Sequence, residues 1–586
     1  MSEPIRIANC SGFYGDRLSA AREMVEGGPI DVLTGDWLAE LTMLILARTQ
    51  RKHPGSGYAR TFVTQMEHVM GTCLDRGIKV VSNAGGLDPA ACAEAVAQVA
   101  RSLGLAPTIA YVNGDDLMAR LEDLRNASQL LNFNSSDAID DISSFITANA
   151  YLGCFGIVEA LSMGADIVVT GRVTDAALVC GPAAWHHRWR RDSFDALAGA
   201  VVAGHVVECG AQVAGGNYSF FGDVAGMDYV GFPWVEVAED GSSVVGKHEG
   251  MGGEVSIGTV TSQLLYEIGA PSYIGPDVTA RFDTIALEQV DRDRVRISGV
   301  RGEAPPTTLK VAMNELGGYR KDLVVALTGL DIEEKARLVE AAFWRACPFR
   351  PDEYESVTTR LIRTDKADPS TNEEAVALWR LTLKDHDERK VGRAVADAVV
   401  ELALATVPGF FIPGSPPSPG APYGVYRPAR VASNLVPQYV TVLGGKRTVI
   451  DSVAPSSEAH VVANGGTRAP APNGPTTFVP LGQLCGARSG DKGGDANLGV
   501  FTRSDEAFAW LDSYLSVDEL RRLLPETAPL SIDRFRLPAL RALNFVIRDL
   551  LEEGVAASTR QDAQAKGLGE WLRSRYVEVP TSLLDP

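Results

Sequence analysis

His205, Glu208 and Cys209 are spaced for acid/base chemistry. Their spacing of i, i+3 and i+4 places the three side chains on one face of a predicted helix. A partly buried carboxylate such as Glu208 can be tuned towards neutral pH and act as a general base, and Cys209 is a candidate nucleophile. The alternative is a structural thiol, because free cysteine is often part of a core. Zinc would need a third protein ligand that the local sequence lacks, so we predict no metal site.

A second set of reactive side chains follows a β-branched run, in the segment Gly171-Arg172-Val173-Thr174-Asp175. Arginine suits bidentate contacts with a carboxylate or phosphate. We therefore predict that Arg172 and Thr174 bind substrate and that Asp175 is a second candidate for the catalytic base. The alternative is a salt bridge between Arg172 and Asp175, with Thr174 or Asp175 as a helix N-cap.

Glycine-rich turns supply further candidates for substrate binding. Gly85 and Gly86 close a predicted strand and precede a helix, whose N-terminal dipole favours an anion. Asn217 follows a Gly-Gly pair and is assigned to substrate binding as well. The alternative for these glycines is a tight turn that needs a residue without a side chain.

The stretch Ala487–Asn497 combines three glycines, an arginine, a lysine, two aspartates and an asparagine. We predict a loop in which Arg488 and Lys492 contact an anionic ligand. Asp491 beside Lys492 would partly neutralise this charge. The alternatives are a polar surface turn and a salt-bridged interface with the large domain.

Four apolar strand-like runs must position these residues. They alternate with helical patterns over the first ~220 residues, as in a parallel α/β sheet, and are predicted at Ile5–Ala8, Ile30–Gly35, Lys79–Ser82 and Asp166–Thr170. Ligands in open α/β sheets bind beyond the carboxyl ends of the strands. The four polar strand ends are therefore expected to meet at one edge.

The predicted fold class is α/β, with a large N-terminal domain, a linker and a small C-terminal domain. The N-terminal domain spans 1–454, with subdivision near 221 and 305, and contains a mainly parallel sheet with a β-rich, ferredoxin-like insertion. A linker follows at 455–478, rich in Pro, Gly, Ser, Asn and Thr. The C-terminal domain, 479–586, is predicted to be α+β and ferredoxin-like.

The β-rich and ferredoxin-like parts follow from local patterns. Hairpins are predicted at Glu236–Lys247 and Thr284–Val300, and a strand at Glu254–Val260. A β-α-β-β-α order follows, with helices at Ile332–Cys347 and about Arg389–Ala405, and strands near Val357–Ile362 and Ala377–Lys384.

Composition excludes several classes of function. The 586-residue chain has a net charge of −19, which argues against binding nucleic acid or an anionic membrane surface. Its eight cysteines form no C-x-x-C pair, as in proteins with reduced thiols. The sequence shows no leader and no apolar run long enough to span a bilayer. We expect a cytoplasmic protein.

Several long motifs, in this order, resemble the acyclic terpene utilisation family, AtuA. The large domain carries the stretches Ile7–Gly15, Gly35–Leu41, Ser82–Pro89, Thr170–Ala177, Gly204–Asn217 and Gly252–Leu265, and Gly486–Val500 with Leu537–Asp549 resembles the family's ferredoxin-like C-terminal domain. The resemblance implies catabolism of acyclic terpenes through carboxylated acyl-CoA intermediates. It assigns no catalytic residue.

Three functions remain open. The first is a non-redox enzyme (hydratase, isomerase or lyase) for a small, branched, anionic acyl substrate, with a coenzyme A thioester as candidate substrate and no definite cofactor; no dinucleotide fingerprint supports hydride transfer. The second is a non-catalytic partner of an acyl-CoA carboxylase-type complex. The third is a nucleotide-dependent enzyme with an atypical phosphate loop. A homo-oligomer is expected.

Overall fold

Two units make up the chain in a computed structural model, which describes residues 2–133, 135–414, 417–450 and 469–584. The first unit comprises Met1–Asn314, Tyr426–Val555 and Asp562–Pro586, and the second comprises Glu315–Val425 and Ala556–Gln561. Most of the predicted linker, 455–478, lies outside the described residues.

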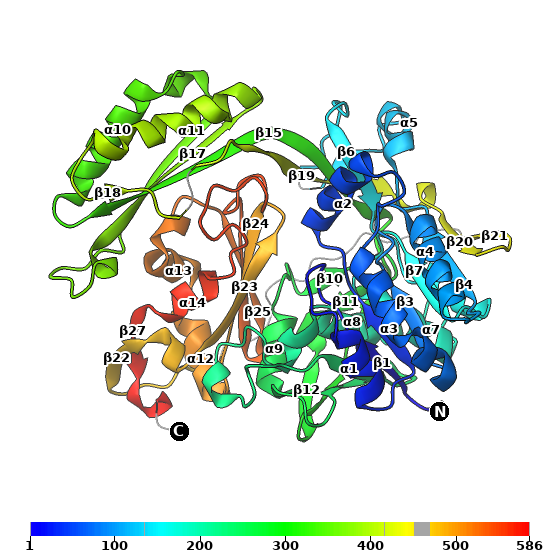
Figure 1. The fold of residues 1–586 in the computed structure, drawn as a ribbon. Coiled ribbons are helices and arrows are strands. Elements are labelled where there is room, and N and C mark those ends of the chain that lie inside the picture. The colour runs from blue at the N-terminus through cyan, green and yellow to red at the C-terminus, as the bar shows by residue number, and fades with distance from the viewer. Residues whose placement is uncertain (1, 134, 415–416, 451–468, 585–586) are drawn as a thin grey trace. The chain divides into compact units, whose positions relative to one another are not determined.

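An eleven-stranded mixed sheet organises the first unit (Figure 1). In sheet order its strands are β12 (Ala286–Asp291), β13 (Arg294–Ser298), β9 (Ser243–Lys247), β8 (Pro233–Val237), β1 (Ile5–Asn9), β2 (Val32–Gly35), β3 (Lys79–Ser82), β7 (Ile167–Thr170), β4 (Ile109–Asn113), β20 (Gln438–Val442) and β21 (Arg447–Ile450). Strands β1, β2, β3, β7 and β4 run parallel. This confirms the four predicted strands and their common direction.

The sheet is less parallel than predicted, because both predicted hairpins belong to it. Strand β8 pairs antiparallel with β1, and β9, β13 and β12 follow in antiparallel order. On the opposite edge β20 and β21 are also antiparallel. The hairpins at Glu236–Lys247 and Thr284–Val300 therefore extend the sheet instead of forming a separate β-rich insertion. A hairpin pattern in sequence predicts the pairing within the hairpin but not the partner of its outer strands.

Helices cover both faces of the parallel strands. Alternate strand residues face opposite sides: Val32 and Val81 belong to one buried cluster, and Leu33 and Val80 to the other. On the second side lie α1 (Ala20–Gly27), α3 (Arg60–Arg76) and α4 (Pro89–Ser102), and on the first side α6 (Phe155–Ser162), α7 (Ala177–His187) and α8 (Phe194–Val207). Two more helices are α2 (Glu40–Lys52) and α5 (Leu121–Asn126).

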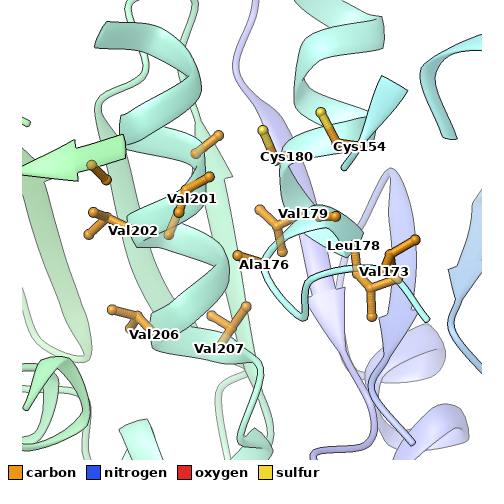
Figure 2. Packing of buried hydrophobic residues seen from close by; sticks show 14 of the residues in the cluster. Cys154, Val173, Ala176, Leu178, Val179, Cys180, Val201, Val202, Val206 and Val207 are labelled. Carbon is orange, nitrogen blue, oxygen red and sulfur yellow. The ribbon is translucent and has the colours of Figure 1, made fainter. Parts of the chain in front are cut away.

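Helix α8 is the central helix of this unit, and every residue from Leu197 to Val207 is buried. Its apolar character on all sides is typical of a helix without a solvent face. Figure 2 shows Val201 and Val207 on the side of α8 toward α7, which carries Val179. No helix in the described part of the chain is both long and apolar enough to cross a bilayer.

The strand predicted at Glu254–Val260 is wrong, because a helix, α9 (Ile257–Leu264), begins inside this range. A reciprocal cap starts the helix. The Ser256 hydroxyl accepts from the Thr259 N–H, and the Thr259 hydroxyl accepts from the Ser256 N–H at 2.9 Å. The cap outweighs the β-branched residues that suggested a strand. A small sheet of β10 (Ser272–Ile274), β11 (Thr279–Arg281) and β14 (Arg301–Glu303) follows.

The helices and strands of the second unit follow one another along the chain in the predicted β-α-β-β-α order. Its sheet runs β16-β17-β15-β19, with β15, β17 and β16 antiparallel to their neighbours. The elements are β15 (Thr308–Thr328), α10 (Ile332–Ala346), β16 (Ser356–Ile362), β17 (Val376–Asp385), α11 (Arg393–Val400), β18 (Phe410–Phe411) and β19 (Ala421–Ala432). Strands β15 and β19 continue into the first unit, which also contains β5 (Leu131–Asn132) and β6 (Phe145–Ala150).

The C-terminal part of the first unit is a four-stranded antiparallel sheet with short helices. Its strands are β23 (Gly486–Lys492), β24 (Asp495–Phe501), β26 (Ala542–Ile547) and β25 (Ile532–Leu537), and its helices are α12 (Asp505–Tyr514), α13 (Val517–Leu523) and α14 (Leu568–Arg573). A separate ribbon pairs β22 (Thr476–Pro480) with β27 (Tyr576–Pro580). The predicted loop at Ala487–Asn497 is wrong: it is a β-hairpin that turns at Gly493-Gly494.

Candidate functional site

The polar ends of the parallel strands meet at one edge of the sheet, as predicted. Asp36 follows β2 and Asn83 follows β3, and both side chains are buried. The Asp36 carboxylate accepts hydrogen bonds from Asn83 Nδ2 at 2.6 Å and from the Leu38 N–H at 2.9 Å. Burial and then the charge of Asp175 raise the pKa of Asp36 well above its ordinary value. The strand ends therefore form a buried polar floor.

Arg172, directly after β7, is the buried cation of this edge, and its side chain is only 3% exposed. Its guanidinium donates to Asp175 Oδ1 at 2.8 Å and to the Leu38 carbonyl at 2.6 Å. Burial alone would lower the pKa of Arg172, but Asp175, Tyr151 and Asp36 raise it above the ordinary value, so the side chain stays charged. The salt bridge between Arg172 and Asp175, which the sequence analysis gave as the alternative to substrate binding, is thus present. The Asp175 side chain is still 32% exposed.

The neighbours of Arg172 fix its backbone. The Arg172 N–H donates to Asp115 Oδ2 at 2.9 Å, and Asn149 donates to the same oxygen at 2.8 Å. Burial raises the pKa of Asp115 to about 6. Thr174 is half-buried and its N–H donates to the Leu152 carbonyl at 2.9 Å. Neither alternative N-cap is used, because helix α7 is capped by the residue after Asp175.

His205 and Glu208 lie together at the end of α8, as their spacing predicts. His205 Nδ1 is 3.0 Å from Glu208 Oε1, without the alignment of a hydrogen bond. Burial lowers the pKa of His205 to about 4. Burial, Asp175 and Glu267 raise the pKa of Glu208 well above its ordinary value. At neutral pH the imidazole is therefore uncharged. The raised pKa of Glu208 favours its protonated form, which suits a proton donor better than a resting base.

Cys209 follows Glu208 and is partly exposed, whereas the other seven cysteines are buried. Burial, followed by the charges of Glu208 and Glu267, raises the pKa of the Cys209 thiol well above its ordinary value. The thiol is thus protonated at neutral pH. A nucleophilic role for Cys209 would require a base to remove this proton.

Hairpin β23–β24 brings Arg488 and Lys492 to the same cluster. Lys492 Nζ donates to the Glu267 carbonyl at 3.1 Å, and the charge of Lys492 affects both His205 and Glu208. The Arg488 guanidinium lies 4.2 Å from the centre of the Tyr266 ring. Both predicted cations therefore reach the cluster that holds Glu208.

The glycines of this hairpin are explained by close packing. A Cβ at Gly490 would lie 2.5 Å from the Tyr266 ring, and a Cβ at Gly499 would lie 2.5 Å from the Leu265 side chain. Both distances are shorter than a real Cβ contact. Ser219 Oγ also donates to the Ala487 carbonyl at 2.8 Å. The hairpin is thus an interface within the first unit, one of the alternatives considered for this sequence.

Glu267 is a carboxylate of the cluster that the sequence did not indicate. Its φ of +56° is in the left-handed region, which is uncommon for residues other than glycine and is often found at functional sites. Asn497 Oδ1 accepts from the Glu267 N–H at 2.8 Å, and Asn544 Nδ2 donates to the Gly269 carbonyl at 2.7 Å. The two asparagines, both fully buried, are bonded to each other. They fix the backbone that carries Glu267.

Two aromatic residues missed by the sequence analysis also lie here. The phenol of Tyr273 experiences the charges of Glu208, Asp175 and Glu267, and burial raises its pKa well above the ordinary value. The Tyr273 ring is 5.3 Å from the His205 ring, centre to centre. Tyr266 packs below Arg488, and its hydroxyl accepts a hydrogen bond from a lysine of the C-terminal part. Both phenols are therefore protonated donors near neutral pH.

Three predicted binding residues have no described polar contact with this cluster. A Cβ at Gly85 would lie 2.5 Å from the Thr170 carbonyl oxygen. Gly86 has a φ of +53° and a Cβ there would meet Leu46 at 2.4 Å, so packing explains both glycines. Asn217 is exposed, in a left-handed turn. Their roles in ligand binding stay predictions. Among the described residues, no group of three His, Cys, Asp or Glu side chains is placed to hold a metal ion.

Comparisons with known proteins support the resemblance seen in the sequence. The sequence model described as "Acyclic terpene utilisation family protein AtuA" matches residues 5–442, and that of the "AtuA ferredoxin-like domain" matches residues 479–578. Searches of curated proteins and of solved structures gave no significant match. The first match alone covers well over half of the chain. The chain therefore belongs to the acyclic terpene utilisation family, AtuA.

Proposed function

We propose that the protein is a cytoplasmic catabolic enzyme that performs non-redox acid/base chemistry on a carboxylated, branched acyl thioester or acid. The family links the chain to acyclic terpene utilisation. The observation that carries the proposal is the contrast between two buried side chains. The surroundings of Glu208 raise its pKa and favour the protonated carboxyl, whereas Arg172 stays a cation beside Asp175, and its charge also acts on Glu208. Groups with such divergent protonation behaviour are typical of acid/base sites.

Each group has a distinct role in this proposal. Arg172 and Lys492 hold the anionic group of the substrate. Asp175 removes a proton from the carbon next to the acyl carbonyl, and the electron pair of the C–H bond moves toward the carbonyl. The Glu208 carboxyl donates its proton to the developing carbonyl oxygen, forming an enol. Isomerisation and dehydration begin with this step, and hydration and C–C cleavage of the aldol type pass through an enol or enolate of the same kind.

Ligand-dependent melting tests the substrate class. A ligand at 100 times its Kd stabilises the native state by about 2.7 kcal/mol. We expect branched acyl thioesters or their free acids to raise the melting temperature, and ATP and NAD to leave it unchanged. The protein would then be incubated in D2O with the stabilising compound. Deuterium at the α-carbon supports the enzyme, and its absence with every stabilising compound contradicts the proposed chemistry.

A non-catalytic partner of an acyl-CoA carboxylase-type complex is the second candidate. The second unit carries Leu330 and Leu404, which are 82% and 102% exposed. In this second candidate function, the two leucines contact the partner protein. Co-purification with a carboxylase that is lost in Leu404→Asp, together with no deuterium exchange, would favour this function. Light scattering of the same samples would measure the expected homo-oligomer.

A further inference from the structure

A row of alternating cations and aromatic rings begins at Arg172. The Arg172 guanidinium lies 4.2 Å from the centre of the Tyr151 ring, and Lys310 Nζ lies 5.0 Å from the same ring centre. Lys310 is also 5.9 Å from the Phe133 ring centre, which the Arg430 guanidinium approaches at 5.9 Å. We call these five residues the cation–aromatic row.

A sixth residue closes the row on one side. Lys310 Nζ lies 5.4 Å from the centre of the Tyr426 ring, so three rings surround this ammonium group. The Tyr426 phenol also contributes to the electrostatic environment of Arg172. All these residues belong to the first unit.

Backbone pairing fixes the row. The Tyr151 N–H donates to the Lys310 carbonyl at 2.9 Å, and the N–H of the next residue donates to the Arg172 carbonyl at 3.1 Å. The Phe133 N–H donates to the Pro428 carbonyl at 3.0 Å, two residues before Arg430 on β19. The backbone of the row therefore belongs to β15 and β19 and to the residues just after β5, β6 and β7.

The side chains of the row differ in exposure. Arg172 is buried, Tyr151, Lys310 and Arg430 are half-buried, and Phe133 is 40% exposed. The row thus includes both the buried Arg172 and a ring, Phe133, that is accessible from the surface. A ligand that reaches Arg172 along it would pass Lys310 and Arg430.

The charge of the row indicates an anionic ligand. Aromatic cages commonly bind a cation, but here the protein itself supplies a cation to each ring. Guanidinium and ammonium groups are well suited to bind a carboxylate or a phosphate. The Nε atoms of Arg172 and Arg430 are buried and have no hydrogen-bond partner among the described residues. A buried donor without a partner is unfavourable, and an anionic acceptor would satisfy it.

We propose that the cation–aromatic row binds a second anionic group of the ligand, a carboxylate or a phosphate, so that the site selects compounds with two anionic groups. This inference rests on the proposed function for the first anionic group, which Arg172 and Lys492 hold. Lys310 and Arg430 bind the second group, and Tyr151 and Tyr426 flank the chain between the two groups. The row is a specificity determinant, and it takes no part in proton transfer.

Calorimetric titration of the full chain tests the proposal. The probes are 3-methylglutarate, with two carboxylates, 3-methylbutyrate, with one, and free coenzyme A, with phosphates. The variants are Lys310→Met and Arg430→Met. Arg427→Met is the matched control, because Arg427 lies on the same strand but pairs with Glu553. Unchanged melting temperatures show that the variants are folded, and Lys310→Arg should retain binding.

We expect each Met variant to weaken binding of a two-anion probe about tenfold, the loss of one charge-assisted hydrogen bond, and the control to bind as the wild type does. A loss with 3-methylglutarate identifies a carboxylate, and a loss only with coenzyme A identifies a phosphate. Equal affinities for one and two anions, equal affinities in the variants, or no binding of any probe would each overturn the proposal. Deuterium exchange tests the proposed catalysis separately. A negative result there would contradict the catalytic proposal and leave the binding of a second anionic group to be decided by calorimetry.

Discussion

Arg172 and Glu208 are both largely buried, yet burial affects their charges differently. Arg172 is 3% exposed and Glu208 is 9% exposed. Arg172 donates to Asp175 and stays ionised. Glu208 faces an uncharged imidazole and the charges of Asp175 and Glu267, which raise its pKa and favour the protonated form. Burial disfavours a charge, and the nearest partner decides whether the charge persists. In the proposed function, this difference supplies both an anchor for the substrate and a proton donor.

Glu208→Gln is expected to have the largest effect, because it removes the carboxyl that donates a proton in the proposed reaction and keeps the shape of the side chain. Loss of general acid catalysis should slow deuterium exchange by about 10²- to 10⁴-fold. Substrate binding, measured by melting temperature, should change little. Glu249→Gln is the control, since Glu249 is exposed. Exchange at the wild-type rate in Glu208→Gln would assign the proton transfer to another group.

Arg172→Ala removes the buried guanidinium, the charged member of this pair of sites. Asp175 and Asp36 lose their cation, and we expect a loss of about 2 kcal/mol in unfolding free energy, less than for a fully buried pair because Asp175 is partly exposed. The KM for an anionic substrate should rise more than kcat falls. Urea unfolding and initial rates measure the two effects. The double variant Arg172→Ala/Asp175→Asn should recover part of the stability; no recovery would contradict the pairing.

His205→Gln examines the neutral imidazole. The pKa of His205 is about 4 in the native protein and about 6.5 when unfolded, so the unfolded chain binds more protons between these values. His205 therefore contributes stability that is present above pH 6.5 and is lost as pH falls toward 4. Between pH 6.5 and 5 the wild type should lose about 2 kcal/mol more than His205→Gln. Equal losses in urea unfolding would show that His205 is charged in the native state.

Glu267→Gln is expected to have the smallest effect, which is measured as the reactivity of the Cys209 thiol. Glu267 raises the pKa of this thiol, after burial and Glu208. Glu267→Gln should lower the thiol pKa and make alkylation by iodoacetamide at pH 8 a few-fold faster. Cys209→Ala identifies the background from the buried cysteines. An unchanged or slower rate would place Glu267 away from the thiol.

Local sequence patterns predicted the parts of the site that depend on neighbours in the chain. The strand ends at Asp36 and Arg172 were placed correctly because their strands are short, apolar runs buried on both faces. The His205–Glu208 contact follows from helical spacing alone.

The missed features depend on residues far apart in sequence. Glu267 carries no local motif, and its backbone is fixed by Asn497, 230 residues away. The Ala487–Asn497 hairpin was mistaken for a loop because its glycines and polar residues are complementary to α9 and Tyr266 instead of to water. The cation–aromatic row joins β15 and β19 to the residues just after β5, β6 and β7, whose pairing no local pattern reveals.

The hydrogen bonds of Asn497 and Asn544 couple ligand binding at the site to the packing of the C-terminal sheet against the segment that carries Glu267. Because they hold the Glu267 backbone, a ligand that requires Glu267 in this position also favours the docked sheet, and by linkage a docked sheet favours the ligand to the same extent. The Glu267 N–H donates to Asn497, so its exchange rate with solvent measures this coupling. We expect the exchange to slow as the site is saturated with ligand.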